Sequence, residues 1–164
     1  ACLLLIARTP RRLLITITGF TVAHSVTLAL SALDIVRIPT PPVEAVIALS
    51  VVFLSWEIVR GDENSLAYRY PVAISSSFGL LHGFGFASGL STVGMPRAEI
   101  PLALAMFNVG VELGQLTFVG LILLSYRALR TLEFRWPRWA ELGPAYAIGS
   151  LGAYWTLQRT VMMF

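Results

Sequence analysis

The chain has 164 residues, of which 56% are hydrophobic and 13% are charged. Soluble domains carry about a quarter charged residues, so this composition excludes an ordinary soluble domain and predicts an all-α integral membrane protein. The net charge is +3 and all 12 basic residues are Arg, but they lie at the ends of apolar runs, which indicates membrane orientation and not nucleic-acid binding.

The apolar runs set the number of membrane spans. A helix needs about 20 apolar residues to cross the hydrocarbon of a bilayer. Residues 1–7 (ACLLLIA) are too few, and we expect either the end of a helix that begins upstream or a short interfacial anchor. The prediction is a single domain, residues 1–164, built as a bundle of about six transmembrane helices with the first one incomplete. The complete spans are 13–33, 43–59, 71–90, 101–126 and 144–164.

The arginines predict the orientation of these spans. Nine of the 12 fall on one side of the predicted bundle and three on the other. Because basic loops stay in the cytoplasm, the nine-arginine side should be cytoplasmic, with Trp136 and Trp139 at its membrane interface. The cytoplasmic set is Arg8, Arg11, Arg12, Arg60, Arg69, Arg127, Arg130, Arg135 and Arg138, and the opposite set is Arg37, Arg97 and Arg159.

The first complete span carries a histidine within FTVAHSVTLALS. Thr21, His24 and Ser31 project from one helix face, and Ser25 lies beside them. A neutral imidazole is a common ligand for nickel, zinc, copper and iron. A lone histidine is also a common hydrogen-bonded packing residue, so both roles stay open for His24.

Two glutamates mark the ends of the next span, PPVEAVIALSVVFLSWEIV. Glu44 falls in the predicted first turn, where the helix dipole favours a carboxylate, so structural and metal-binding roles are equally open. Glu57 lies near the cytoplasmic end, where we expect partial solvation. Ser50 lies two turns before Glu57 on the same side.

His82 lies in a glycine-rich run, SSSFGLLHGFGFASG. Gly79, Gly83 and Gly85 permit close helix contact, or local unwinding that turns carbonyls toward a cavity. A second histidine at membrane depth strengthens the metal-ligand interpretation of the first.

The stretch FNVGVELGQL places three strongly polar side chains in an apolar helix. Asn108, Glu112 and Gln115 stand at i, i+4 and i+7 and share one face, whereas Gly110 and Gly114 form a small-xxx-small pair suited to close packing. A charge at the centre of a membrane helix costs about 2.5–3.5 kcal/mol on insertion scales. We therefore favour a hydrophilic path or ion site over interhelical hydrogen bonding alone.

These nitrogen and oxygen donors, without a membrane thiol, suit nickel or cobalt better than copper(I), which favours sulfur. An enzyme is not predicted. HExxH, P-loop and dinucleotide-binding motifs are absent from the sequence, and no histidine follows His82 to act as a base for Ser88.

Four segments resemble, in order, the HupE/UreJ family of hydrogenase and urease accessory membrane proteins: FTVAHSVTLALSAL, VEAVIALSVVFLSWE, FGLLHGFGFASGL and FNVGVELGQL. The resemblance implies a six-helix protein of the bacterial inner membrane that supplies nickel to metalloenzymes as a nickel or cobalt permease. The metal-path residues that it implies are His24, Glu44, Glu57, His82, Asn108 and Glu112, and Gln115 belongs to the same motif. Their positions on the helix faces add Ser25, Thr21 and Ser50 as supporting residues.

The chain departs from this family in one place. The family's first helix bears a His-x-x-x-Gly-x-Asp-His signature, and ACLLLIARTP has no equivalent. Either that helix begins upstream of Ala1 or its ligands are lost, and the second case favours an alternative function as a non-transporting subunit of a larger membrane complex. We expect no tightly bound cofactor, and the expected partners are the lipid bilayer, further copies of the chain or other membrane subunits, and a transported Ni²⁺ or Co²⁺ ion.

Overall fold

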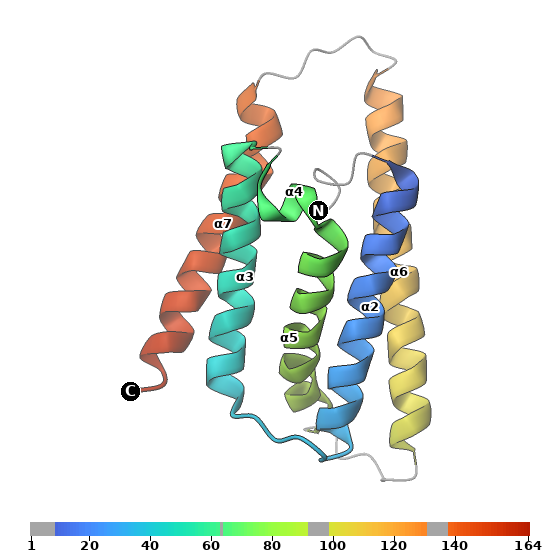
Figure 1. Ribbon diagram of the computed structural model, residues 1–164, viewed down its shortest axis with the longest axis vertical. Coiled ribbons are helices and arrows are strands. Elements are labelled where there is room, and N and C mark those ends of the chain that lie inside the picture. The colour runs from blue at the N-terminus through green and yellow to red at the C-terminus, as the bar shows by residue number, and fades with distance from the viewer. Residues whose placement is uncertain (1–8, 63, 92–98, 131–137) are drawn as a thin grey trace.

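The computed structural model describes residues 9–62, 64–91, 99–130 and 138–164. Within these ranges the chain forms five long helices and one short helix, and no strand occurs there (Figure 1). The predicted all-helical fold class is confirmed. The predicted partial helix at residues 1–7 lies outside the described residues, as do Arg8, Arg97, Arg135 and Trp136.

The first two long helices each have a proline among their first two residues, and proline lacks the N–H that a first helical turn leaves unpaired. In α2, Pro10–Ala32, the hydroxyl of Thr9 caps the helix by accepting a hydrogen bond from the Arg12 backbone N–H at 3.3 Å. α3, Thr40–Arg60, is capped at its C-terminus by Gly61, whose φ of +65° is the left-handed conformation that glycine adopts at low cost.

The remaining helices differ from the predicted spans mainly at their ends. They are α4, Leu66–Arg69; α5, Pro71–Ser91; α6, Ile100–Arg130; and α7, Arg138–Val161. The short α4 was not predicted. Pro144 was expected to begin the last span, but it lies inside α7. A proline there removes the N–H that would bond the carbonyl of Ala140, and the helix continues through this single missing bond.

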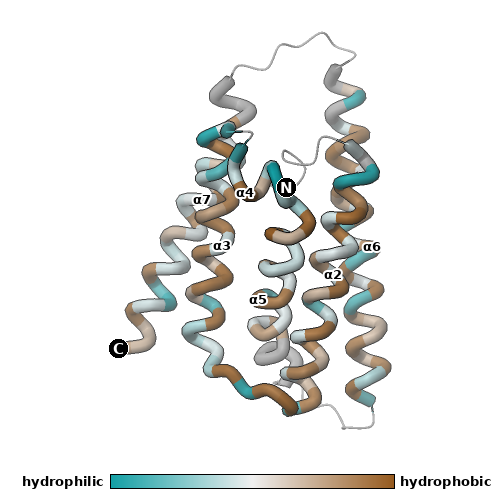
Figure 2. The backbone as a smooth tube through the Cα atoms, in the orientation of Figure 1, coloured by the Kyte–Doolittle hydropathy of each residue, from teal (hydrophilic) through white to brown (hydrophobic). Residues whose placement is uncertain are grey.

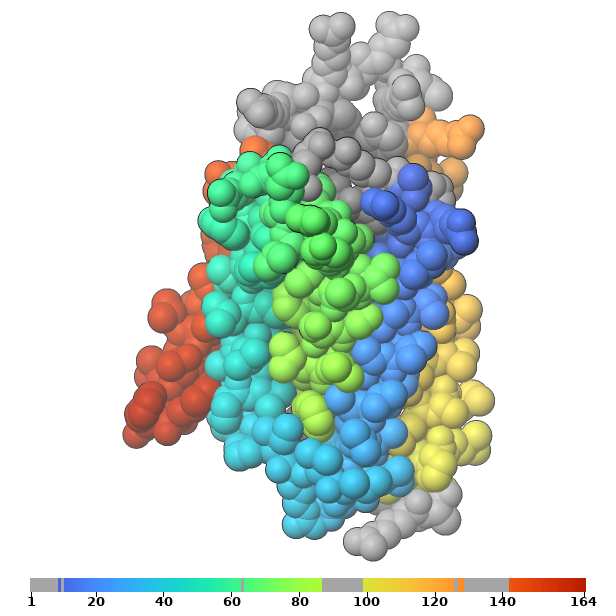
Figure 3. All heavy atoms as spheres, viewed as in Figure 1, coloured from blue at the N-terminus to red at the C-terminus, as the bar shows by residue number. Residues whose placement is uncertain are grey.

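The long helices lie side by side in the order α7, α3, α5, α2, α6 (Figure 1). α5 packs most extensively against α2 and also contacts α3, whereas α7 lies along α3 and α6 along α2. Figure 3 shows that α3, α5 and α2 form one continuous face of the molecule. α5 is therefore the central helix, and its two sides face different groups of polar side chains.

The α2–α5 contact is close because glycines of α5 lie against α2. A Cβ atom on Gly79 would be 2.4 Å from the Phe20 carbonyl oxygen, and one on Gly83 would be 2.4 Å from the His24 carbonyl oxygen. Ser75, which is buried, donates a hydrogen bond from Oγ to the Thr16 carbonyl at 3.0 Å. This contact fixes the position of His24 along the axis of α5.

α6 is attached to the rest of the molecule along one side. Among its described residues, Leu104 is the only buried one. Apart from the adjoining turns of α6 itself, no described atom lies within 4 Å of a Cβ placed on Gly110 or Gly114. The close helix packing that we expected at these two glycines is therefore not made within the described chain.

Three of the helices are long and apolar enough to cross a membrane, judged by length and composition over the described residues. They are Arg11–Ala32, Thr40–Arg60 and Ile100–Ser125. Figure 2 shows hydrophobic residues along much of these helices and hydrophilic residues gathered at the end where α2 begins and α3 ends.

Candidate functional site

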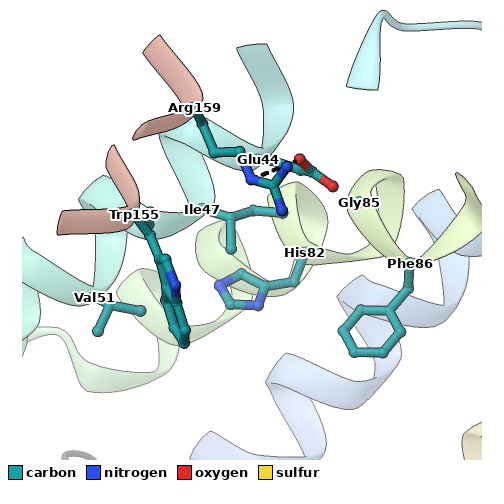
Figure 4. Close-up of a pocket in the computed structure, with 9 residues that line it drawn as sticks. Glu44, Ile47, Val51, His82, Gly85, Phe86, Trp155 and Arg159 are labelled. Atoms are coloured by element: carbon teal, nitrogen blue, oxygen red, sulfur yellow. Dashed lines mark ion pairs between the residues drawn. The ribbon is translucent and has the colours of Figure 1, made fainter. Parts of the chain in front are cut away.

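A pocket of about 550 Å³ lies between α3, α5 and α7, and we call it the α3–α5–α7 pocket (Figure 4). α5 contributes His82 and Phe86, α3 contributes Glu44, and α7 contributes Trp155 and Arg159. The His82 imidazole lies between the rings of Trp155 and Phe86, with the Glu44 and Arg159 side chains beside it. The pocket thus combines an imidazole, a carboxylate and a guanidinium within apolar walls.

The hydrogen bonds of the Ser50 hydroxyl indicate which nitrogen of His82 carries the proton. The Nε2 atom of His82 lies 3.4 Å from Ser50 Oγ. Ser50 uses its single hydroxyl proton to bond the Ile47 carbonyl at 2.7 Å. While Ser50 keeps this bond its Oγ is the acceptor, and in that arrangement His82 donates from Nε2–H and has a lone pair on Nδ1. A lone pair on a neutral imidazole is what a metal ion binds.

Glu44 is held by an ion pair with Arg159. The Arg159 Nε and Glu44 Oε2 atoms are 3.1 Å apart, with side-chain exposures of 43% and 31%. We expected Glu44 in the first turn of its helix, but α3 begins at Thr40, so Glu44 lies beyond that turn. The helix dipole acts mainly within the first turn, and the partner of Glu44 is a guanidinium from α7 instead.

His24 lies on the other side of α5, inside an aromatic cluster. It is 2% exposed and stacks on Phe20, with ring centroids 5.8 Å apart. Phe20 also contacts His82 edge-on at 5.5 Å, and Phe86 and Phe107 contact the His24 ring. The Nδ1 atom of His24 has no hydrogen-bond partner within the described chain. Phe20 and Phe86 therefore separate His24 from the pocket that contains His82.

A line of polar contacts joins α2 to α6, and we call it the α2–α6 polar seam. Thr18 Oγ1 donates to Glu112 Oε1 at 3.4 Å, and Thr21 Oγ1 lies 3.3 Å from Gln115 Oε1. Thr21 also lies 3.2 Å from the Ile17 carbonyl, and its single proton serves one acceptor at a time. The carboxylate and amide of the FNVGVELGQL motif thus face hydroxyls of α2.

Two further predicted residues bond within their own helices. Asn108 donates from Nδ2 to the Leu104 carbonyl at 2.9 Å, while its buried Oδ1 has no partner among the described residues. Ser25 donates to the Thr21 carbonyl at 2.6 Å. Such bonds satisfy a hydroxyl or amide in apolar surroundings without a neighbouring helix.

The exposure of Glu57 differs from the sequence-based expectation. We expected partial solvation, but Glu57 is 3% exposed. Its Oε2 accepts hydrogen bonds from Ser65 Oγ at 3.0 Å and from the Ala67 backbone N–H at 2.7 Å. These donors lie at the start of α4, whose first N–H groups have no partner inside the helix. Glu57 therefore caps α4 at the arginine-rich end of the molecule.

The predicted metal-path residues thus fall into separate groups. The α3–α5–α7 pocket holds Glu44 and His82, the aromatic cluster holds His24, the α2–α6 polar seam holds Glu112, and Glu57 caps α4. In the part of the chain that the structure describes, no three His, Cys, Asp or Glu side chains are grouped so that they could hold a metal ion together. The residues do not form one continuous site in this conformation.

A family model described as HupE / UreJ protein matches residues 1–159, essentially the whole chain. The chain belongs to the HupE/UreJ family. No curated protein and no solved structure matches it. Membership of HupE/UreJ and the three apolar helices together point to a membrane protein. The family also suggests a nickel- or cobalt-related accessory role, and it is not a catalytic family.

Within this HupE/UreJ chain, sequence reasoning missed Arg159 and Trp155 as pocket residues. Arg159 was interpreted as one of three arginines on the arginine-poor side. A lone arginine on that side, at the same membrane level as Glu44, was the available signal for an ion pair. Trp155 precedes it by one helical turn and projects from the same face.

Proposed function

We propose that this protein is an inner-membrane permease for a divalent transition metal, nickel or cobalt, and that it supports metalloenzyme maturation. The observation that carries the proposal is the α3–α5–α7 pocket, where a carboxylate and an imidazole line one cavity of about 550 Å³. Nickel and cobalt bind nitrogen and oxygen donors of this kind. Family membership supports the same class of cargo.

The proposed pocket binds the ion loosely. His82 offers the lone pair of Nδ1, because Nε2–H is directed to Ser50, and Glu44 offers a carboxylate oxygen. Two protein donors leave other coordination positions of the ion to water. Transport requires binding strong enough for the ion to enter and weak enough for it to leave, and a two-donor site meets both needs.

The aromatic cluster and the α2–α6 polar seam form the proposed second stage. His24 and Asn108 carry buried atoms without partners, and Glu112 and Gln115 lie on the same side of α5 as His24. Passage between the two stages requires the rings of Phe20 and Phe86 to move, because both rings lie between His24 and His82.

Uptake of radioactive nickel into proteoliposomes that contain the purified full chain tests this proposal. We expect His82→Ala and Glu44→Gln each to lower the initial rate of uptake at subsaturating nickel by about 10- to 100-fold, because each substitution removes one charge-assisted contact with the ion. Thr117→Val is the matched control, because Thr117 is exposed and bonds only the Leu113 carbonyl of its own helix. Unchanged uptake by both pocket variants would exclude the pocket from the path.

One observation favours the alternative, a non-transporting subunit of a larger membrane complex. The face of α6 around Gly110 and Gly114 is open within the described chain, as a surface that packs on a partner helix would be. The same proteoliposomes distinguish the two functions. A purified chain that takes up no nickel or cobalt, in vesicles where its folding is verified, would favour the subunit.

A further inference from the structure

The ion pair between Arg159 and Glu44 lies in the lining of the α3–α5–α7 pocket (Figure 4). Arg159 comes from the last turn of α7 and Glu44 from α3, so the pair joins two helices across the cavity. His82 lines the same cavity, and its imidazole lies next to the pair in the close-up. In this conformation the Glu44 carboxylate, which lines the cavity together with His82, is already paired with a cation of the protein.

A second cation at Glu44 competes with this pair. The Oε2 atom of Glu44 already accepts the Arg159 guanidinium, and the positive charge of Arg159 repels an entering divalent ion. Arg159 cannot remove the conflict by losing a proton, because an arginine side chain stays charged. Movement of the guanidinium away from Glu44 would remove both the competition for the carboxylate and the repulsion of the ion.

The geometry allows that movement. Both side chains are partly exposed, at 43% and 31%. A long arginine side chain near a helix end can place its charge in the aqueous interface while its methylenes stay on apolar surface. α7 ends at Val161, only two residues beyond Arg159, so such an interface lies within reach.

We infer that Arg159 is a tethered counter-ion: it occupies Glu44 while the pocket is empty, and a divalent metal ion displaces it when binding between Glu44 and His82. This inference rests on the proposed metal permease function and adds a residue that sets the metal concentration at which the pocket fills. Arg159 touches no metal in this scheme, so it sets the affinity of the pocket and is not a ligand.

Equilibrium binding of radioactive Ni²⁺ to the full chain in lipid nanodiscs tests the inference. We expect Arg159→Gln to lower the nickel Kd by about two- to fivefold, because removal of a partly exposed ion pair leaves Glu44 available. Arg159→Lys keeps the charge and should keep the Kd near that of the unchanged protein. Arg60→Gln is the matched control, since Arg60 contacts Trp56 and Asp62 outside the pocket.

A double-mutant cycle identifies the cause of the effect. If Arg159 acts by competing for Glu44, Arg159→Gln should leave the Kd unchanged in a Glu44→Gln background. A nickel Kd that is raised or unchanged in Arg159→Gln would overturn the inference. So would an Arg159→Gln substitution that lowers the nickel Kd by the same factor in the Glu44→Gln background as in the unchanged protein.

The two proposals fail separately in this design. Nickel binding with the expected Arg159 effect, but without uptake into proteoliposomes, would overturn the permease function alone. Uptake with no effect of Arg159→Gln on the Kd would overturn the counter-ion role alone. No saturable binding of Ni²⁺ or Co²⁺ to the unchanged protein would overturn both.

Discussion

Glu57 shows how a single buried carboxylate organises a turn of the backbone. Its Oε2 receives both the Ser65 hydroxyl and the Ala67 N–H, and Ala67 is itself 1% exposed. Replacing Glu57 with Leu keeps the volume but leaves that N–H without a partner. We expect the free energy of unfolding to fall by about 1–3 kcal/mol, the cost of an unsatisfied buried donor, as measured by SDS titration in mixed micelles.

Glu57→Gln separates this capping role from a role in transport. The glutamine oxygen can accept the same two hydrogen bonds, so most of the stability lost in Glu57→Leu should return. If Glu57→Gln is as stable as the unchanged protein but takes up nickel much more slowly, the charge itself is needed and the purely structural account is wrong.

Individual residues also show where sequence reasoning reaches its limit. A histidine and a carboxylate at membrane depth could be selected from the sequence because such groups are costly there. Their partners could not be selected, because Glu44 meets Arg159 from the last helix and Glu57 meets donors in an unpredicted short helix. Pairing depends on which helices become neighbours, and residue type alone does not specify that.

At the level of helices, the contact between α2 and α5 depends on Gly83. A Cβ atom there would be 2.0 Å from Thr27 Oγ1, 2.4 Å from the His24 carbonyl oxygen and 2.8 Å from the Leu28 backbone nitrogen. The threonine side chain can rotate away, but the two backbone atoms cannot. We expect Gly83→Ala to lower the free energy of unfolding by about 1–3 kcal/mol or more, the usual cost of overpacking.

Gly114→Ala is the matched control for that experiment, because no described atom beyond the adjoining turns of α6 lies within 4 Å of its Cβ position. Alanine favours the helical state over glycine by about 0.8–1.0 kcal/mol, so this variant should be at least as stable as the unchanged protein. Equal stability of Gly83→Ala and Gly114→Ala in the same SDS titration would contradict the close α2–α5 contact.

The glycines also show which part of the fold the sequence predicts. Apolar runs with prolines at their starts located the long helices, since length and hydropathy are local properties. Helix pairing is not local. Gly110 and Gly114 match a packing motif but face open space in the described chain. A Cβ atom placed on Gly149 or Gly152 of α7, which we did not single out, would lie 3.0–3.5 Å from α3 atoms. A small residue permits close packing without specifying which helix approaches.

For the whole molecule, the arrangement of the helices gathers the arginines at one end. One end of the molecule contains the start of α2, the end of α3, the short α4 and the end of α6 (Figure 1). These segments carry Arg11 and Arg12, Arg60, Arg69, and Arg127. Arg60 lies over the ring of Trp56, and Arg69 over that of Tyr70, at 5.2 and 5.3 Å. Such aromatic and basic pairs are typical of a membrane–water interface.

The positive-inside rule predicts that this end is cytoplasmic, and labelling of introduced cysteines tests the orientation. Cys2, the single native cysteine, is first replaced by Ser. Asn64→Cys lies at the arginine-rich end and Ile35→Cys, at a side chain 65% exposed, lies at the other. In intact bacterial cells a membrane-impermeant maleimide should label Ile35→Cys and not Asn64→Cys, and permeabilised cells should label both. The reverse pattern would place the arginines outside the cell. The Glu44–Arg159 pair would then lie toward the cytoplasm, and the pocket would receive metal from the cytoplasm and not from outside the cell.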